Sequence, residues 1–124
     1  MVAAWRFAGF ALLAWAVAPP RRAPGSPPAV VAEVRNASGR SGLARQVTRL
    51  LRERGIDVVY FGNAAQEVDS TIVLVRRGPL PPGEAVARVL GVKRLVAAPD
   101  PKPRVDVTVL LGRDYRFPKD RLPL

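Results

Sequence analysis

The sequence predicts a single domain of the α/β (α+β) class, a two-layer sandwich in which a mixed sheet carries two helices on one face. Short runs of β-branched residues alternate with segments of helical periodicity, in the order β-α-β-β-α-β-β. Hydrophobic residues make up 48% of the chain and charged residues 24%, as in globular proteins and unlike disordered ones. Because βα crossovers are right-handed, both helices are expected on the same side of the sheet.

The first strand and helix are predicted from adjoining patterns. Val30–Val34 is rich in β-branched residues, and the stretch 36–42 that follows consists of turn formers. From Gly42 to Arg54, apolar residues recur at helical spacing, namely Leu43, Ala44, Val47, Leu50 and Leu51. Ser41 or Ser38 is expected to cap the first turn, and Gly55 to end the helix.

The remaining elements follow from similar patterns. Asp57–Phe61 predicts a second strand, and Thr71–Val75, apolar on both faces, a third strand inside the sheet. After the break at Gly78–Gly83, the expected elements are a helix at Glu84–Leu90 ending at Gly91, a weaker strand at Arg94–Ala98 and an alternating strand at Val105–Leu111. The tail from Arg113 to Leu124 is expected to be irregular.

The N-terminus predicts export from the cytoplasm. Phe7–Ala18 is uninterrupted apolar sequence, and as a helix it would rise about 18 Å, against about 30 Å for a membrane core. Its length favours a signal peptide, while the prolines after Ala18 would hinder cleavage and leave a signal anchor as the alternative. The predicted organisation is therefore leader 1–20, Pro/Arg-rich linker 21–29, folded domain 30–115 and irregular tail 116–124. A helix belonging to the domain itself is the competing interpretation of the apolar run.

The charge balance and side-chain inventory restrict the function. The chain carries 20 Lys and Arg against 10 Asp and Glu, a net charge of +10, which attracts polyanions such as nucleic acid, anionic lipid surfaces or phosphate-rich wall polymers. It has no histidine and no cysteine, the commonest zinc ligands, general base and thiol nucleophile. We therefore expect a non-enzymatic protein with no cofactor and no metal.

Several motifs together resemble one family. A Val-rich strand runs into Asn-Ala-Ser-Gly-Arg-Ser-Gly-Leu-Ala at 36–44, and the helix closes at Arg-Gly-Ile-Asp-Val at 54–58. Near the end stands Val-Asp-Val-Thr-Val-Leu-Leu-Gly-Arg-Asp-Tyr at 105–115. From Val30 to Tyr115 the chain resembles the C-terminal domain of LytR-type proteins, the accessory domain of LytR-CpsA-Psr cell-envelope proteins. The family usually has Asn-Gly where this chain has Asn36-Ala37, which bears on whether that turn needs a positive φ.

The resemblance implies an envelope context, outside the cytoplasm, in a membrane-anchored or secreted protein. The partners it implies are anionic cell-wall polymer or peptidoglycan, or an envelope protein, with membrane contact through the N-terminal segment. The sequence leaves no room for the phosphotransferase domain that the family domain typically follows, so no activity is carried over.

The candidate binding residues lie in the first βα loop and on the first helix. A loop at the start of a helix offers free N–H groups to an anion, and here it comprises Asn36, Ser38, Gly39, Arg40, Ser41 and Gly42. On the helix, Arg45, Arg49 and Arg52 fall within about 60° of one another, opposite the apolar face. A glycine-rich connection and a solvated helix face are the plain alternatives.

The residues leave two other functions open. An RRM-like nucleic-acid-binding module would need aromatic residues on its central strands, and only Tyr60 and Phe61 stand on a predicted strand, so nucleic acid is the less favoured partner. Asp106, Asp114 and Tyr115, with Asp69 and Ser70, could be read as an acid/base set. We expect instead that Asp114 and Tyr115 close the domain by hydrogen bonds after the last strand.

Overall fold

The computed structural model describes residues 29–118. The predicted leader, nearly all of the linker and the end of the tail lie outside the described residues, so the structure does not test them. Within the described part the elements follow the predicted order: β1 (Val31–Asn36), α2 (Leu43–Glu53), β2 (Asp57–Asn63), β3 (Ile72–Val75), α3 (Pro81–Leu90), β4 (Leu95–Ala97) and β5 (Val107–Leu111). No helix among these residues combines the length and the apolar character needed to cross a membrane.

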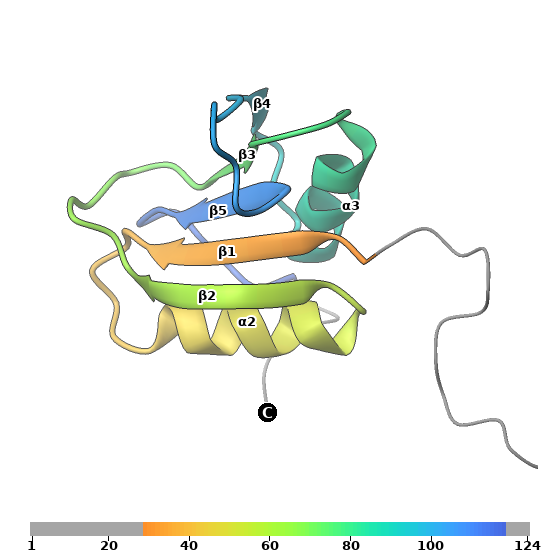
Figure 1. The fold of residues 1–124 in the computed structure, drawn as a ribbon. Coiled ribbons are helices and arrows are strands. Elements are labelled where there is room, and N and C mark those ends of the chain that lie inside the picture. Colours follow the sequence, from red (N-terminus) through yellow and green to blue (C-terminus); the bar gives the residue numbers. More distant parts are fainter. Residues whose placement is uncertain (1–28, 119–124) are drawn as a thin grey trace, which may run out of the picture.

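The five strands form one mixed sheet in the order β2-β1-β5-β3-β4. β1 pairs parallel with both β2 and β5, β3 pairs antiparallel with β5, and β4 pairs parallel with β3. β3 has a neighbour on each side, as its apolar sequence predicted, and β2 and β4 are the two edges (Figure 1). The carboxyl ends of β1, β2 and β5 therefore meet at one end of the sheet.

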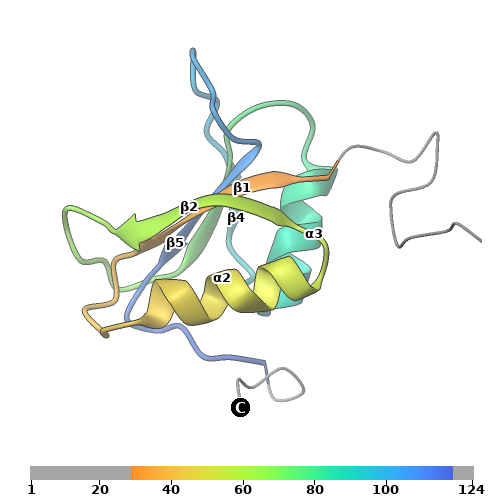
Figure 2. The ribbon, with the colours of Figure 1, turned by 60° about the horizontal axis from the view of Figure 1, so that its bottom comes forward.

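Both helices cover the same face of the sheet, which confirms the predicted two-layer sandwich (Figure 2). α2 packs on β1 and β2, and α3 packs mainly on β3. Strand residues alternate between the two faces, so the side chains of β1 and β5 that face the helices form the core between the layers. The largest of the fully buried side chains are Leu51, Leu90 and Leu111.

The start of α2 differs from the sequence-based prediction. Its N-cap residue is Gly42, at φ +79°, and no side chain caps the first turn, so the expected capping by Ser41 or Ser38 is wrong. The Ser38 hydroxyl instead donates to Asn36 and accepts the Arg40 N–H, which keeps it within the loop. Gly55, at φ +83°, ends the helix as predicted, since glycine adopts that conformation without steric cost.

α3 begins at Pro81, three residues before the expected start at Glu84. Proline is tolerated in the first turn because the N–H it lacks would have no partner inside the helix. Gly83 follows within this turn, and a Cβ there would lie 2.5 Å from a methyl carbon of Val75. The break that the glycine and prolines predicted is thus the first turn of a helix lying close against β3.

Candidate functional site

The three arginines of α2 line one groove. It lies between α2 and the edge strand β2, has a volume of about 420 Å³, and is lined by Arg45, Thr48, Arg49, Arg52, Glu53 and Phe61. We call it the arginine groove. Arg45, Arg49 and Arg52 are exposed, while Leu43, Val47 and Leu50 on the opposite side of the helix are buried. The predicted arrangement of the arginines is confirmed; their role in binding stays a prediction.

The arginines of the groove differ in how they are held. One Nη of Arg52 donates to the carbonyl oxygen of Val58 at 2.7 Å, and its guanidinium carbon lies 6.0 Å from the centre of the Phe61 ring. Arg45 and Arg49 take part in none of the ion pairs found among residues 29–118. Arg52 is therefore anchored to the strand, and two guanidinium groups beside it are available to a ligand.

The loop between β1 and α2 uses its polar groups internally. Asn36 donates from Nδ2 to the Arg40 carbonyl oxygen, and its Oδ1 accepts the Ser38 N–H at 3.0 Å. The Ser38 hydroxyl accepts the Arg40 N–H, also at 3.0 Å. No residue other than glycine has a positive φ in the described part of the chain, so Ala37 does not adopt the conformation that Asn-Gly would favour. The two backbone donors of Ser38 and Arg40 are consequently not free for an anion.

The loop and the arginine groove form separate places on the surface. A hollow of about 390 Å³ contains Asn36, Gly39, Arg40 and Ser41, together with residues that follow β2. Glu67 also lines it, and a Cβ at Gly39 would lie 2.9 Å from a Glu67 carboxylate oxygen. An Nη of Arg40 donates to the Tyr115 carbonyl oxygen at 2.7 Å. Both places contain an acidic side chain and an engaged arginine, Glu53 and Arg52 in the case of the groove. The groove has Arg45 and Arg49 in addition, which form no ion pair among residues 29–118, so it suits an anion better, and binding by the loop remains a prediction.

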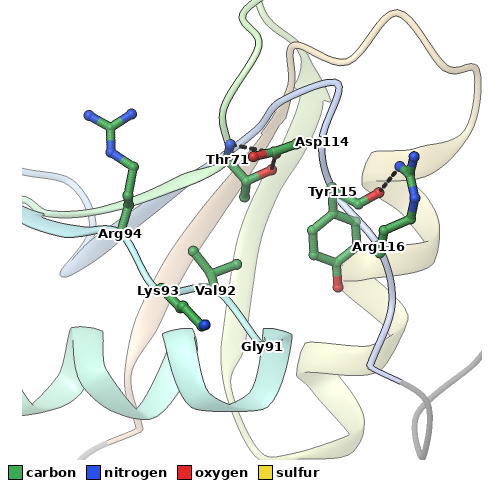
Figure 3. A pocket seen from close by; sticks show the side chains of 8 residues that line it. All are labelled: Thr71, Gly91, Val92, Lys93, Arg94, Asp114, Tyr115 and Arg116. Atoms are coloured by element: carbon green, nitrogen blue, oxygen red, sulfur yellow. Dashed lines mark hydrogen bonds between the residues drawn. The ribbon is translucent and has the colours of Figure 1, made fainter.

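Asp114 joins the end of β5 to the start of β3. Its Oδ1 accepts the Thr71 N–H at 2.8 Å and the Thr71 hydroxyl at 2.7 Å (Figure 3). The Thr71 Oγ1 in turn accepts the Gly112 N–H at 2.9 Å. These hydrogen bonds to the charged form lower the pKa of Asp114, with the Thr71 hydroxyl as the main cause. Asp114 thus closes the domain, and the remaining acidic residues of the alternative acid/base set bind arginines, Asp69 with Arg113 and Asp106 with Arg77.

The basic side chains around this junction do not point toward a common centre. A hollow of about 280 Å³ is lined by Lys93, Arg94 and Arg116 as well as by Asp114 and Tyr115. In Figure 3, Arg94 extends away from the others, and the Arg116 guanidinium bonds to the Tyr115 carbonyl oxygen. Burial raises the pKa of Tyr115 to about 12, although Arg40 acts in the opposite direction. This hollow is therefore a less suitable anion site than the arginine groove.

A β-bulge determines the faces on which the two strand aromatics lie. Tyr60 pairs with Glu33 and Phe61 with Val34, and the register shifts between Ala32 and Glu33. Val34 is buried under the helices, so Phe61 lies on the helix side, where it lines the arginine groove. Tyr60 lies on the open face, with the Arg35 guanidinium 5.2 Å from its ring centre. The two rings cannot form one base-stacking platform, and nothing supports the RRM-like alternative.

Phe61 and Thr48 line the arginine groove but were not among the residues predicted for the site. Thr48 lies one helical turn after Ala44 and is buried, and its position could have been read from the helix period. Phe61 comes from a neighbouring strand, and its side follows from the bulge, for which the sequence gives no signal.

Comparisons with known proteins identify a family. The C-terminal domain of RV0431, a solution structure, has 27% sequence identity and a TM-score of 0.47, covering 77% of this chain and 84% of that one. A comparison with curated proteins finds no match. The family described as LytR cell envelope-related transcriptional attenuator matches residues 29–115, well over half of the chain. The chain therefore belongs to the LytR C-terminal domain family of cell-envelope proteins.

Proposed function

We propose that this chain is a non-enzymatic accessory domain that acts outside the cytoplasm and binds a phosphate-bearing anionic cell-wall polymer in the arginine groove. The observation that supports the proposal is the pair Arg45 and Arg49. Both are exposed, they stand one helical turn apart, and they have no acidic partner among the described residues.

The chemistry of the groove suits phosphate groups in series. Guanidinium is planar, stays charged at any physiological pH and donates two parallel hydrogen bonds to phosphate oxygens. Residues four apart on a helix are separated by a rise of about 6 Å, so Arg45 and Arg49 can contact successive anionic groups of one chain. Binding to a polyanion of this kind releases counterions and weakens with salt.

The non-enzymatic part of the proposal is supported by how the polar side chains are used. The polar groups of the first βα loop and of the Asp114 junction are engaged in hydrogen bonds that hold the fold together. An accessory role in an envelope protein family fits these observations.

The test is co-sedimentation of the full chain with purified sacculi, before and after anionic polymers are stripped, across a salt series. The variant R45Q/R49Q removes the two unpaired guanidinium groups, and R88Q/R94Q removes the same charge from exposed positions on α3 and just before β4. R40Q provides a second control, because Arg40 is bound to the Tyr115 carbonyl oxygen.

We expect R45Q/R49Q to lose binding to unstripped sacculi and to show a smaller salt dependence, by up to about 0.7 in log–log slope for each contact removed. R88Q/R94Q and R40Q should bind as the unmodified chain does. Equal losses in the two double variants would mean that net charge alone drives retention and would refute the groove. Retention on stripped sacculi that is insensitive to salt would mean that the ligand is peptidoglycan and not the anionic polymer. Tight binding to a single-stranded nucleic acid control, with no binding to sacculi, would favour the RRM-like alternative.

A further inference from the structure

The edge strand β2 exposes apolar side chains in a row. Of the large hydrophobic side chains that are exposed among residues 29–118, three are consecutive in β2: Val59 at 55%, Tyr60 at 47% and Phe61 at 37%. β2 is the outermost strand, so alternate backbone N–H and C=O groups along its free side point away from the sheet. An exposed edge of this kind can add a further strand from a partner.

Natural edges are usually protected, and β2 is protected only over its first half. The bulge leaves Val59 without a partner on β1, and the Arg52 guanidinium donates a hydrogen bond to the carbonyl oxygen of Val58. From Tyr60 to Asn63 the pairing with β1 is regular, and no described side chain bonds to the outer backbone groups of these residues. This second half of β2 is the accessible part of the edge.

The positive charges next to the edge favour an acidic partner. α2 runs back along β2, since the chain turns directly from one to the other at Gly55 (Figure 1). The arginines of the helix line the groove together with Phe61 of the strand. From Arg45 to Arg52 the helix rises about 10 Å, the length of about three strand residues. Side chains on one face of an added strand would repeat every 6–7 Å or so, close to the rise of about 6 Å from Arg45 to Arg49.

We propose that the β2 edge, together with the arginine groove, is a docking surface for an extended acidic polypeptide segment of a partner protein. The backbone of the partner's segment pairs with Tyr60–Asn63 of β2. Carboxylates at every second position face Arg45 and Arg49 on the helix side, where Phe61 lies, and the alternate side chains lie next to Tyr60 on the open face. This goes beyond polymer binding, because a glycan or polyol phosphate has no regular series of amide groups to pair with a strand.

A second copy of the chain fits this surface poorly. Pairing β2 with β2 of another copy would bring two arginine faces together without an intervening anion, and like charges side by side disfavour association. The arginines beside the exposed apolar residues therefore favour a partner of opposite charge over self-association.

The experiment titrates the full, ¹⁵N-labelled chain with three capped hexapeptides of alternating Glu and Val: unmodified, N-methylated at every Glu, and N-methylated at every Val. Only one of the two methylated peptides has its altered groups facing β2, because strand backbone groups alternate in direction. We expect amide shifts centred on residues 59–63 with the unmodified peptide, and at least about tenfold weaker binding for one methylated peptide but not the other, the effect of losing two or three hydrogen bonds. Equal binding of all three peptides, or shifts centred elsewhere, would overturn the proposal.

Charge reversal provides a test on the side of the protein. R45E/R49E should lose the Glu-Val peptide and bind the corresponding Lys-Val peptide, whereas R88E/R94E should keep the original preference. A preference unchanged in R45E/R49E would also refute the arginine contacts. The peptide titrations do not test polymer binding, so the docking proposal can fail while polymer binding holds, and the reverse.

Discussion

Replacing Asp114 with alanine is expected to loosen the junction between the end of β5 and the start of β3. The substitution removes the acceptor of two hydrogen bonds, from the Thr71 N–H and from the Thr71 hydroxyl. Thr71 is only 7% exposed, so its N–H cannot simply turn to water. The hydroxyl also holds the Gly112 N–H, so the change reaches the backbone of β5's end.

The magnitude follows from these contacts. A hydrogen bond to a charged acceptor contributes about 1.5–3 kcal/mol, and a neutral one about 1 kcal/mol. Because Asp114 is itself exposed, water competes for its carboxylate, and we expect D114A to lose about 1–2 kcal/mol of unfolding free energy in total. In a domain of this size the melting temperature should fall by roughly 4–8 °C for each kcal/mol. D114N keeps an oxygen acceptor and should lose less.

The pH dependence has a definite sign. The pKa of Asp114 is lowered in the folded state, so the unfolded chain binds the proton more readily. The stabilisation is present above the unfolded pKa of about 3.9 and is lost as the pH falls through the lower folded value. D114A and the unmodified chain should therefore converge in stability below about pH 4.

Urea unfolding followed by circular dichroism measures these differences. D69A is the matched control, because Asp69 is a nearby acidic residue whose side chain is 87% exposed and pairs only with Arg113 at the surface. It should change stability little. If D114A were no less stable than D69A at pH 7, the junction would not hold the two strands together and our reasoning would be wrong.

Two further substitutions test the packing around this junction. G112A should lose about 2 kcal/mol or more of unfolding free energy. A Cβ at Gly112 would lie 2.5 Å from the backbone carbonyl carbon of Ser70, and backbone cannot move aside as the end of a side chain can. A melting temperature within a degree or so of that of the unmodified chain would contradict this. Y115F should be as stable as the unmodified chain or more so at pH 7, because the buried Tyr115 hydroxyl has no hydrogen-bond partner among residues 29–118. Burial raises the Tyr115 pKa to about 12, so the unmodified chain should lose stability as the pH rises from 10 towards 12, and Y115F should lose less; a thermal melt series across that range checks both points.

The elements of the fold could be predicted from local sequence. Five β-branched runs, two helical periods and glycines at 55 and 91 predicted every strand and helix within three residues of its observed ends, because these signals act between residues close in the chain. The arginine face of α2 was predictable for the same reason, since helix geometry alone determines which residues share a side. The cap of α2 was not, because Ser38 bonds within its loop instead.

The tertiary structure decided which distant residues meet. Thr71 and Asp114 are 43 positions apart and Arg40 and Tyr115 are 75 apart, and they meet only because β5 lies between β1 and β3. The face of the sheet on which the Phe61 side chain lies depends on a single bulge. Strand side chains alternate with a period of two, so one extra residue moves all later side chains to the other face. The sequence by itself determined the arginines of the groove, and the bulge in the folded sheet decided that Phe61, and not Tyr60, would lie beside them.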